Sequence, residues 1–339
     1  MGPRSRERRN QLRPLRFFPW AMPALRRARV PQPTAYSRRK IMVLILLGVG
    51  ASMAGSMLRA QDTGTQVVVL GTGTPNPDPE RSGPAVAVIR KGTAYLVDAG
   101  PGVVRRAAQA ERNGIAALRA DRLGVVFLTH LHSDHTVGLP DVIHTGWVRE
   151  RKGPLQLFGP PGTAAMAEHL TEAYRADIDN RLQGLQPHTD SGWMVVAHES
   201  SGGVIYRDSN VTVTAFRVPH DGWTVALGYR FETSDRVIVI SGDTRPSDAV
   251  VRACAGCDVL VHEVYSQAGF ATRTPEWQRY HADAHTSTRE LAELASRAKP
   301  KLLVLYHQLY WGTTDEDLLS EMRKGYSGAV VSARDLGIY

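Results

Sequence analysis

Short apolar runs alternate with segments of helical periodicity from residue 65 to the end of the chain. Runs rich in β-branched and other apolar residues predict strands, because such side chains pack well on a pleated sheet. They span residues 65–70, 85–89, 94–97, 124–128, 155–158, 211–218, 226–232, 237–241, 259–261 and 302–305. Apolar positions with the period of a helix predict helices over residues 103–119, 139–150, 163–175, 247–254, 287–298 and 315–324. This alternation predicts two packed sheets with helices on their outer faces.

The pattern is weaker in residues 177–210, where we expect loops and edge strands that form one wall of a cleft. No repeat divides the chain after residue 61, and no linker rich in Pro, Gly and Ser interrupts it. Residues 61–339 are therefore predicted to form one domain.

The first sixty residues have a different composition. Residues 1–60 hold 13 basic residues against one acidic residue, and an arginine pair, Arg38 and Arg39, precedes the short apolar run 41–49. This order is typical of a twin-arginine export signal. It predicts a leader that is cleaved before Gln61 and a periplasmic location, or a cytoplasmic one if the segment is not a signal. The run is too short and glycine-rich for a confident membrane span. We therefore expect no stable membrane span unless the leader stays uncleaved.

Charge changes the picture once the leader is set aside. The 339 residues include 41 Lys and Arg against 33 Asp and Glu, a formal net charge of +8. Without the 13 basic and one acidic residues of the leader, 28 basic and 32 acidic residues remain, a net charge of −4. Proteins that bind long polyanions carry a basic surface. The mildly acidic body therefore predicts that nucleic acid is not the substrate.

The two cysteines form one Cys-x-x-Cys pair, Cys254 and Cys257, near the end of a predicted helix. Such a pair can be redox-active or half of a zinc site, but no second pair completes four ligands. We interpret both as packing residues or an incidental thiol pair.

Potential metal ligands gather directly after the apolar run 124–128, in the sequence Thr-His-Leu-His-Ser-Asp-His. On extended backbone, His130 and His132 point the same way, because side chains two residues apart share a face. Asp134 and His135 follow on a turn that opens a helix, where they can reach a second ion. Imidazoles and a carboxylate suit a borderline ion such as zinc.

Three further candidates follow later strands. His220 comes after the strand at 211–218, Asp243 after the one at 237–241 and His307 after the one at 302–305. A rigid strand end can hold a ligand accurately, and a dinuclear centre needs ligands beyond the first cluster. Together with that cluster, these residues predict metal ligation.

The cluster resembles the H-x-H-x-D-H signature of the metallo-β-lactamase superfamily at every ligand position. The resemblance implies an α/β fold, a four-layer αββα sandwich of two mixed β-sheets flanked by helices. It implies two Zn²⁺ ions per chain, with Mn²⁺ or Fe²⁺ as possible replacements. The first ion would be held by His130, His132 and His220. The second would be held by Asp134, His135 and His307, with Asp243 bridging both.

Further short sequence segments resemble the ribonuclease Z branch, which includes tRNA 3′-end endonucleases and related arylsulfatases and phosphodiesterases. They occur at residues 70–77, 81–84, 241–245, 262–265 and 284–288, and the resemblance spans roughly residues 65–310. It implies that His285 protonates the leaving oxygen with support from Glu263, and that Asp134 orients the attacking hydroxide or accepts its proton. Asp98 is a candidate for fixing an imidazole tautomer or for capping a turn.

Two departures shape the substrate prediction. Between His135 and His220 there is no long basic, glycine-rich arm of the kind the tRNA enzymes use, and an exported protein would not meet tRNA precursors. The sequence therefore predicts a metal-dependent hydrolase that cleaves a small-molecule ester, a phosphodiester or an aryl sulfate, through a metal-bound hydroxide. The alternatives are a ribonuclease Z-type tRNA 3′-end endonuclease and a lactamase or lactonase. Dimers are common in this branch, which leaves a homodimer open. Five tryptophans are candidate pocket walls: Trp147, Trp193, Trp223, Trp277 and Trp311.

Overall fold

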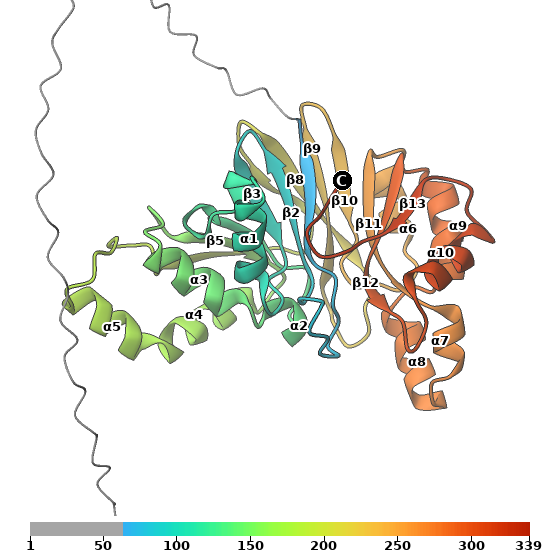
Figure 1. Ribbon diagram of the computed structural model, residues 1–339, viewed down its shortest axis with the longest axis horizontal. Helices are drawn as coiled ribbons and strands as arrows, with labels where there is room; N and C mark the ends of the chain where they lie inside the picture. Colours follow the sequence, from blue (N-terminus) through green and yellow to red (C-terminus); the bar gives the residue numbers. More distant parts are fainter. Residues whose placement is uncertain (1–63) are drawn as a thin grey trace, which may run out of the picture. The chain divides into compact units, whose positions relative to one another are not determined.

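Two seven-stranded sheets pack face to face in the computed structural model, which describes residues 64–339 (Figure 1). The first sheet has the order β14-β1-β2-β3-β4-β5-β6. Its strands are β1 (Gln66–Gly71), β2 (Ala85–Arg90), β3 (Thr93–Val97), β4 (Val125–Phe127), β5 (Leu155–Gly159), β6 (Val195–Glu199) and β14 (Gly337–Ile338).

The second sheet has the order β13-β12-β11-β10-β9-β8-β7. Its strands are β7 (Gly203–Arg207), β8 (Val211–Val218), β9 (Ala226–Thr233), β10 (Val237–Ile240), β11 (Val259–Tyr265), β12 (Leu302–Leu309) and β13 (Val330–Ser332). Both sheets are mixed, because β7 to β10 pair antiparallel and β10 to β13 parallel, while β1 to β3 pair antiparallel and β3 to β6 parallel.

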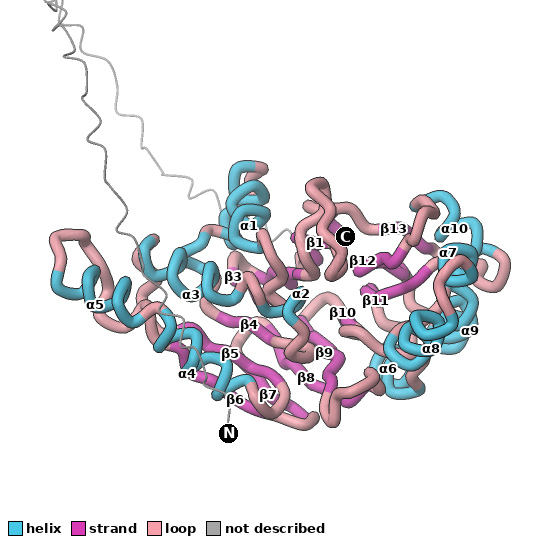
Figure 2. The backbone as a smooth tube through the Cα atoms, turned by 90° about the horizontal axis from the view of Figure 1, so that it is seen from below, coloured by secondary structure: helices cyan, strands magenta, loops and turns pink. Residues whose placement is uncertain are grey.

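Helices cover the outer face of each sheet, as the view along the layers shows (Figure 2). The first sheet is covered by α1 (Val103–Arg112), α3 (Leu139–Val148) and α4 (Thr163–Ala173), and the second by α6 (Asp248–Cys254), α9 (Thr288–Ala298) and α10 (Asp315–Arg323). The remaining helices are α2 (Ser133–Thr136), α5 (Arg175–Gln183), α7 (Gln267–Ala271) and α8 (Pro275–Ala284). The prediction of a two-sheet sandwich with outer helices is confirmed.

Alternation along the strands builds three apolar layers. In β1, Val67 and Val69 face the second sheet, whereas Val68 and Leu70 pack under the helices. Both faces of this strand are buried, which explains its continuous apolar run. In β8 the side chains of Val211 and its neighbours two and four residues on are buried, and those between them are half-buried. Burial of these apolar side chains is the main favourable term in folding.

A β-bulge interrupts the pairing of β11 with β12. Glu263 pairs with Tyr306, but Val264 pairs with Gln308, so His307 is left over between two ladder positions. His307 has a φ of 45°, in the left-handed region that non-glycine residues rarely adopt. The bulge turns the His307 side chain out of the regular alternation of the strand.

Several predicted boundaries are wrong. The first helix ends at Arg112 rather than 119, because Gly114, with a φ of 102°, follows and stops it. The helix expected at 163–175 ends at Ala173, and α5 follows it, while α2, α7 and α8 were not predicted. Residues 177–210 do supply the edge strands β6 and β7 of the two sheets.

The two cysteines form a buried disulfide between Cys254 and Cys257 at the end of α6. They pack in the layer beneath α6 and α9, as packing residues would, but they are not a free thiol pair.

The predicted leader over residues 1–60, including the arginine pair, lies outside the described residues. Among residues 64–339, no helix has the length and apolar character needed to cross a bilayer.

Candidate metal centre

Histidine and aspartate side chains from both sheets meet at one edge of the sandwich, at the ends of β4, β8 and β10 and at the bulge in β12. The segment after β4 continues into α2, which lies at the lower edge in Figure 1. The structure brings together all seven residues predicted as metal ligands, in groups whose nitrogen and oxygen atoms lie within 4.8 Å of one another. These residues are His130, His132, Asp134, His135, His220, Asp243 and His307.

The first group consists of three imidazoles. His132 Nδ1 lies 2.9 Å from His130 Nε2 and 3.2 Å from His220 Nε2. Burial lowers the pKa of all three side chains, so they are neutral at pH 7. His220 Nδ1 donates to the carbonyl of Ala284 at 2.7 Å, which leaves a lone pair on its Nε2. Nitrogens that face one another in this way fit a cation better than they fit hydrogen bonds.

The second group adds carboxylates. His307 Nε2 lies 3.2 Å from Asp134 Oδ2 and 3.5 Å from Asp243 Oδ2, and His135 Nε2 lies 3.5 Å and 3.4 Å from the same two oxygens. His135 Nε2 and Asp243 Oδ1 are buried without a hydrogen-bond partner. Buried polar atoms normally have partners. A divalent cation would satisfy both atoms, and this set of donors suits zinc.

Asp98 positions one of these imidazoles. Its Oδ2 accepts a hydrogen bond from His135 Nδ1 at 2.8 Å, and its Oδ1 accepts one from the backbone nitrogen of Thr129 at 2.8 Å. Both interpretations of Asp98 therefore hold, since it fixes a histidine tautomer and caps the turn. Burial opposes protonation of His135, but the carboxylates of Asp243 and Asp98 outweigh it and raise the pKa of His135. Asp98 itself has a φ of 61°.

His285 and Glu263 lie beside the second group. His285 Nδ1 is 3.4 Å from Glu263 Oε2 and 3.8 Å from Asp243 Oδ2. Glu263 Oε1 accepts hydrogen bonds from the backbone nitrogens of Thr286 at 2.8 Å and Thr244 at 3.3 Å, which fix its orientation. Burial lowers the pKa of His285 to about 4 and raises that of Glu263 well above its ordinary value. Burial therefore favours a neutral imidazole and a protonated carboxyl in this pair. His285 ends α8 and does not cap α9, whose N-cap is Ser287.

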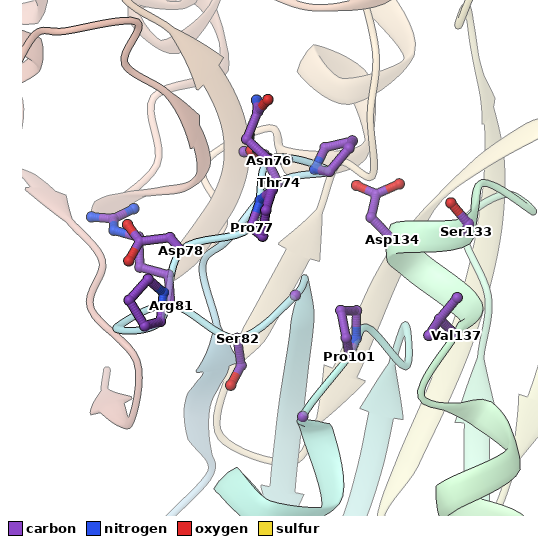
Figure 3. Close-up of a pocket in the computed structure, with 14 residues that line it drawn as sticks. Thr74, Asn76, Pro77, Asp78, Arg81, Ser82, Pro101, Ser133, Asp134 and Val137 are labelled. Carbon is purple, nitrogen blue, oxygen red and sulfur yellow. Dashed lines mark hydrogen bonds between the residues drawn. The ribbon is translucent and has the colours of Figure 1, made fainter.

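Two cavities border the centre. The first has a volume of about 640 Å³ and lies between α2 and the loop of residues 74–83. Figure 3 shows Ser133 and Asp134 on one side of it and Thr74 and Asn76 on the other. The second, of about 370 Å³, is lined by residues 219–223, Arg245 and Asp283. Residues 177–210, which we expected to form one wall of a cleft, line neither of these two cavities.

The glycine turn at residues 71–73 supports the first cavity. A Cβ on Gly71 would lie 1.9 Å from the carbonyl oxygen of Gly83, and one on Gly73 would lie 2.7 Å from that of Ser82. Glycine is needed at both positions because the two backbone segments touch. Asp335 fastens the same turn, accepting from the backbone nitrogens of Thr72 at 2.9 Å and Ser82 at 2.8 Å. No local signal in the sequence identifies Asp335.

Trp223 makes a contact that is incompatible with ligation by His132. Its Nε1 can only donate, and it lies 3.1 Å from His132 Nε2. A neutral imidazole carries one hydrogen, so when His132 Nδ1 binds an ion that hydrogen is on Nε2 and two donors meet. We expect Trp223 to turn away, so that adding Zn²⁺ to chelator-treated protein changes tryptophan emission. The change should be absent in Trp223→Phe, although five other tryptophans remain. Unchanged emission in wild-type protein that has bound zinc would contradict this.

Similarity to known proteins identifies the family to which the chain belongs. Residues 93–308 match the family described as the beta-lactamase superfamily domain. A ribonuclease Z of Mycobacterium bovis is 39% identical over 249 residues, which cover 71% of this chain and 85% of that protein. A ribonuclease Z of Mycobacterium sp. (strain KMS) is 37% identical over 246 residues, 72% of this chain and 84% of that protein. The chain belongs to the ribonuclease Z branch of the metallo-β-lactamase superfamily.

Solved structures agree on the fold. Human tRNase Z, short form, superimposes with a TM-score of 0.61 at 23% identity over 81% of this chain and 98% of that one. The metallo-β-lactamase fold protein YhfI from Bacillus subtilis gives a TM-score of 0.59 at 18% identity over 81% and 99% of the two chains. The predicted αββα sandwich and the predicted ribonuclease Z branch are both confirmed. As a ribonuclease Z relative, the protein is a metal-dependent hydrolase acting on ester bonds.

The predicted partner is wrong. We expected a small-molecule ester and no nucleic acid, but the relatives that cover most of this ribonuclease Z-like chain are named as ribonucleases, and the human structure as a tRNase. Net charge was a poor guide, because binding of a polyanion depends on where the basic groups lie and not on their sum.

Proposed function

We propose that the protein is a ribonuclease Z-type endonuclease that hydrolyses a phosphodiester bond at the 3′ end of tRNA precursors. The observation that carries the proposal is the 39% identity over 85% of a ribonuclease Z. The site supports it, because the buried pair His285 and Glu263 lies beside the candidate metal ligands, where a leaving oxygen would need a proton.

We assign two divalent ions to the centre, with zinc as the preferred metal. His130, His132 and His220 would hold the first ion, and the ring nitrogens that face one another support this. The second would be held by Asp134, His135 and His307, and Asp243 would contact both. Imidazole and carboxylate ligands also accept Mn²⁺ or Fe²⁺, so availability decides between them.

When bound, the ions would polarise the phosphodiester and lower the pKa of an attacking water. The chain itself provides the proton transfers. Asp134 faces the first cavity, where it would orient the water and accept its proton. His285 would donate a proton from Nε2 to the leaving oxygen, while its Nδ1 takes the proton held by Glu263. This exchange requires the neutral imidazole and protonated carboxyl that burial favours.

The test is cleavage of a tRNA precursor with a 3′ trailer by the purified protein with Zn²⁺ or Mn²⁺. We expect a single endonucleolytic cut that releases the trailer, that chelator abolishes, and that restored metal recovers. The matched control is the same tRNA without a trailer, which should stay intact. Turnover of p-nitrophenyl sulfate or a nitrophenyl phosphodiester without any RNA cleavage would contradict the proposal. The proposal would also be contradicted if cell fractionation found the protein entirely outside the cytoplasm.

A further inference from the structure

A row of aromatic rings in contact runs from the surface of α8 to the metal centre. The Trp277 side chain is 49% exposed, and its ring stacks on that of His281, with centroids 5.5 Å apart and planes at 21°. The ring of His281 lies 5.6 Å from that of His285, at 38°. His285 in turn stacks on His307, 5.8 Å away and at 21°. An exposed indole is thus connected by ring contacts to a candidate metal ligand.

The guanidinium group of Arg273 lies over the outer part of this row. The guanidinium carbon of Arg273 is 5.7 Å from the ring centroid of Trp277 and 5.6 Å from that of Trp311. Within residues 64–339, the Arg273 side chain forms neither a salt bridge nor a hydrogen bond with a side chain, and its Nε is buried without a partner. By contrast, Arg81, which lies over Tyr310, is 3.7 Å from Asp315. Arg273 is held by aromatic rings rather than by a carboxylate, so its charge is available to an anion.

An aromatic face beside an unpaired guanidinium matches the chemistry of a nucleotide. Single-stranded RNA is bound by stacking of bases on aromatic side chains and by cations that contact phosphates. Trp311, Trp277 and His281 supply the π faces, and Arg273 supplies the cation. The row passes through His285, the residue that would protonate the leaving oxygen in the proposed reaction.

We propose that Trp277 and Arg273 form a nucleotide subsite, in which one base of the RNA stacks on Trp277 and a neighbouring phosphate contacts Arg273. The subsite rests on the proposed endonuclease function and deepens it, because it adds recognition of single-stranded RNA beside the cleaved bond. A small ester that is bound at the metal centre would not reach Trp277, since the ring of His281 lies between Trp277 and His285.

The test compares two substrates in Trp277→Ala, Trp277→Phe and wild type. For a tRNA precursor we expect Trp277→Ala to raise KM about 5- to 150-fold, the range for loss of one stacked base, and Trp277→Phe to stay close to wild type. Hydrolysis of methyl p-nitrophenyl phosphate should be unchanged in both. Trp193→Ala is the matched control, because Arg175 also lies over the Trp193 ring, at 5.4 Å, but on α5 at the opposite end of the molecule from α8 in Figure 1.

Two further measurements identify the contacts. Precursors with one base removed at successive positions should lose the same binding in wild type, and at the stacked position Trp277→Ala should have no additional effect. Arg273→Gln should lower the slope of log affinity against log salt by about 0.7, as expected for one phosphate contact.

The outcomes separate this subsite from the proposed function. RNA cleavage with an unchanged KM in Trp277→Ala overturns the subsite alone. Equal losses on RNA and on methyl p-nitrophenyl phosphate overturn it too, because Trp277 would then act through the structure of the centre. If wild type hydrolyses methyl p-nitrophenyl phosphate but leaves every RNA intact, the proposed function fails and the subsite fails with it.

Discussion

Replacing Asp243 with alanine should reduce cleavage of a tRNA precursor by about 10³-fold or more, because both proposed metal positions lose a ligand. Its Oδ2 lies within 3.5 Å of ring nitrogens of both His135 and His307, and its carboxylate is buried. Turnover under saturating Zn²⁺ and the number of ions bound per chain, measured by elemental analysis, check this. We expect fewer than two ions per chain in the variant.

Asp221→Ala is the matched control, since Asp221 is an exposed carboxylate that lines the cavity beside His220. This variant should keep both its metal content and its turnover. If Asp243→Ala binds two ions and retains turnover within about tenfold of wild type, Asp243 does not bridge the metals.

Replacing His285 with alanine should lower cleavage of RNA by about 10²- to 10⁴-fold while the metal content stays at the wild-type value. The leaving oxygen of an RNA chain is an alkoxide and needs a proton, whereas p-nitrophenolate does not. The same variant should therefore hydrolyse methyl p-nitrophenyl phosphate at nearly the wild-type rate. Comparing kcat for the two substrates measures the proton transfer directly.

Glu263→Gln completes this experiment, because the amide still accepts from the backbone nitrogens of Thr286 and Thr244 but cannot pass a proton to His285. It should show the same selective loss on RNA, to a smaller extent. A loss of equal size on both substrates would mean that His285 positions the metal ligands and does not act as an acid.

The ligand set was accessible from the sequence because each member follows an apolar run that forms a strand. His130 to His135 follow β4, His220 follows β8 and Asp243 follows β10. The strand pattern is local and can be read from the sequence. Strands β8 and β10 run in the same direction, because each pairs antiparallel with β9, so their carboxyl ends lie at the same edge of the second sheet.

What the sequence did not predict depends on contacts between distant segments. Helix α8 was missed because its side chains are mostly exposed, and its His281 packs against Trp311 rather than on a sheet. His307 was expected after the end of a strand, but it lies inside β12 at a bulge that only the pairing with β11 defines. The tether from Asp335 to Thr72 spans more than 260 residues, which no local pattern records.

Selection for heat resistance and selection for catalysis would act against each other at His307. A non-glycine residue in the left-handed region costs on the order of 1 kcal/mol, and the bulge interrupts the ladder between two buried strands. Loss of the extra residue would restore regular pairing of β11 with β12, and it would also remove a proposed ligand. Directed evolution of this protein for thermal stability alone would therefore be expected to straighten β12 and abolish activity.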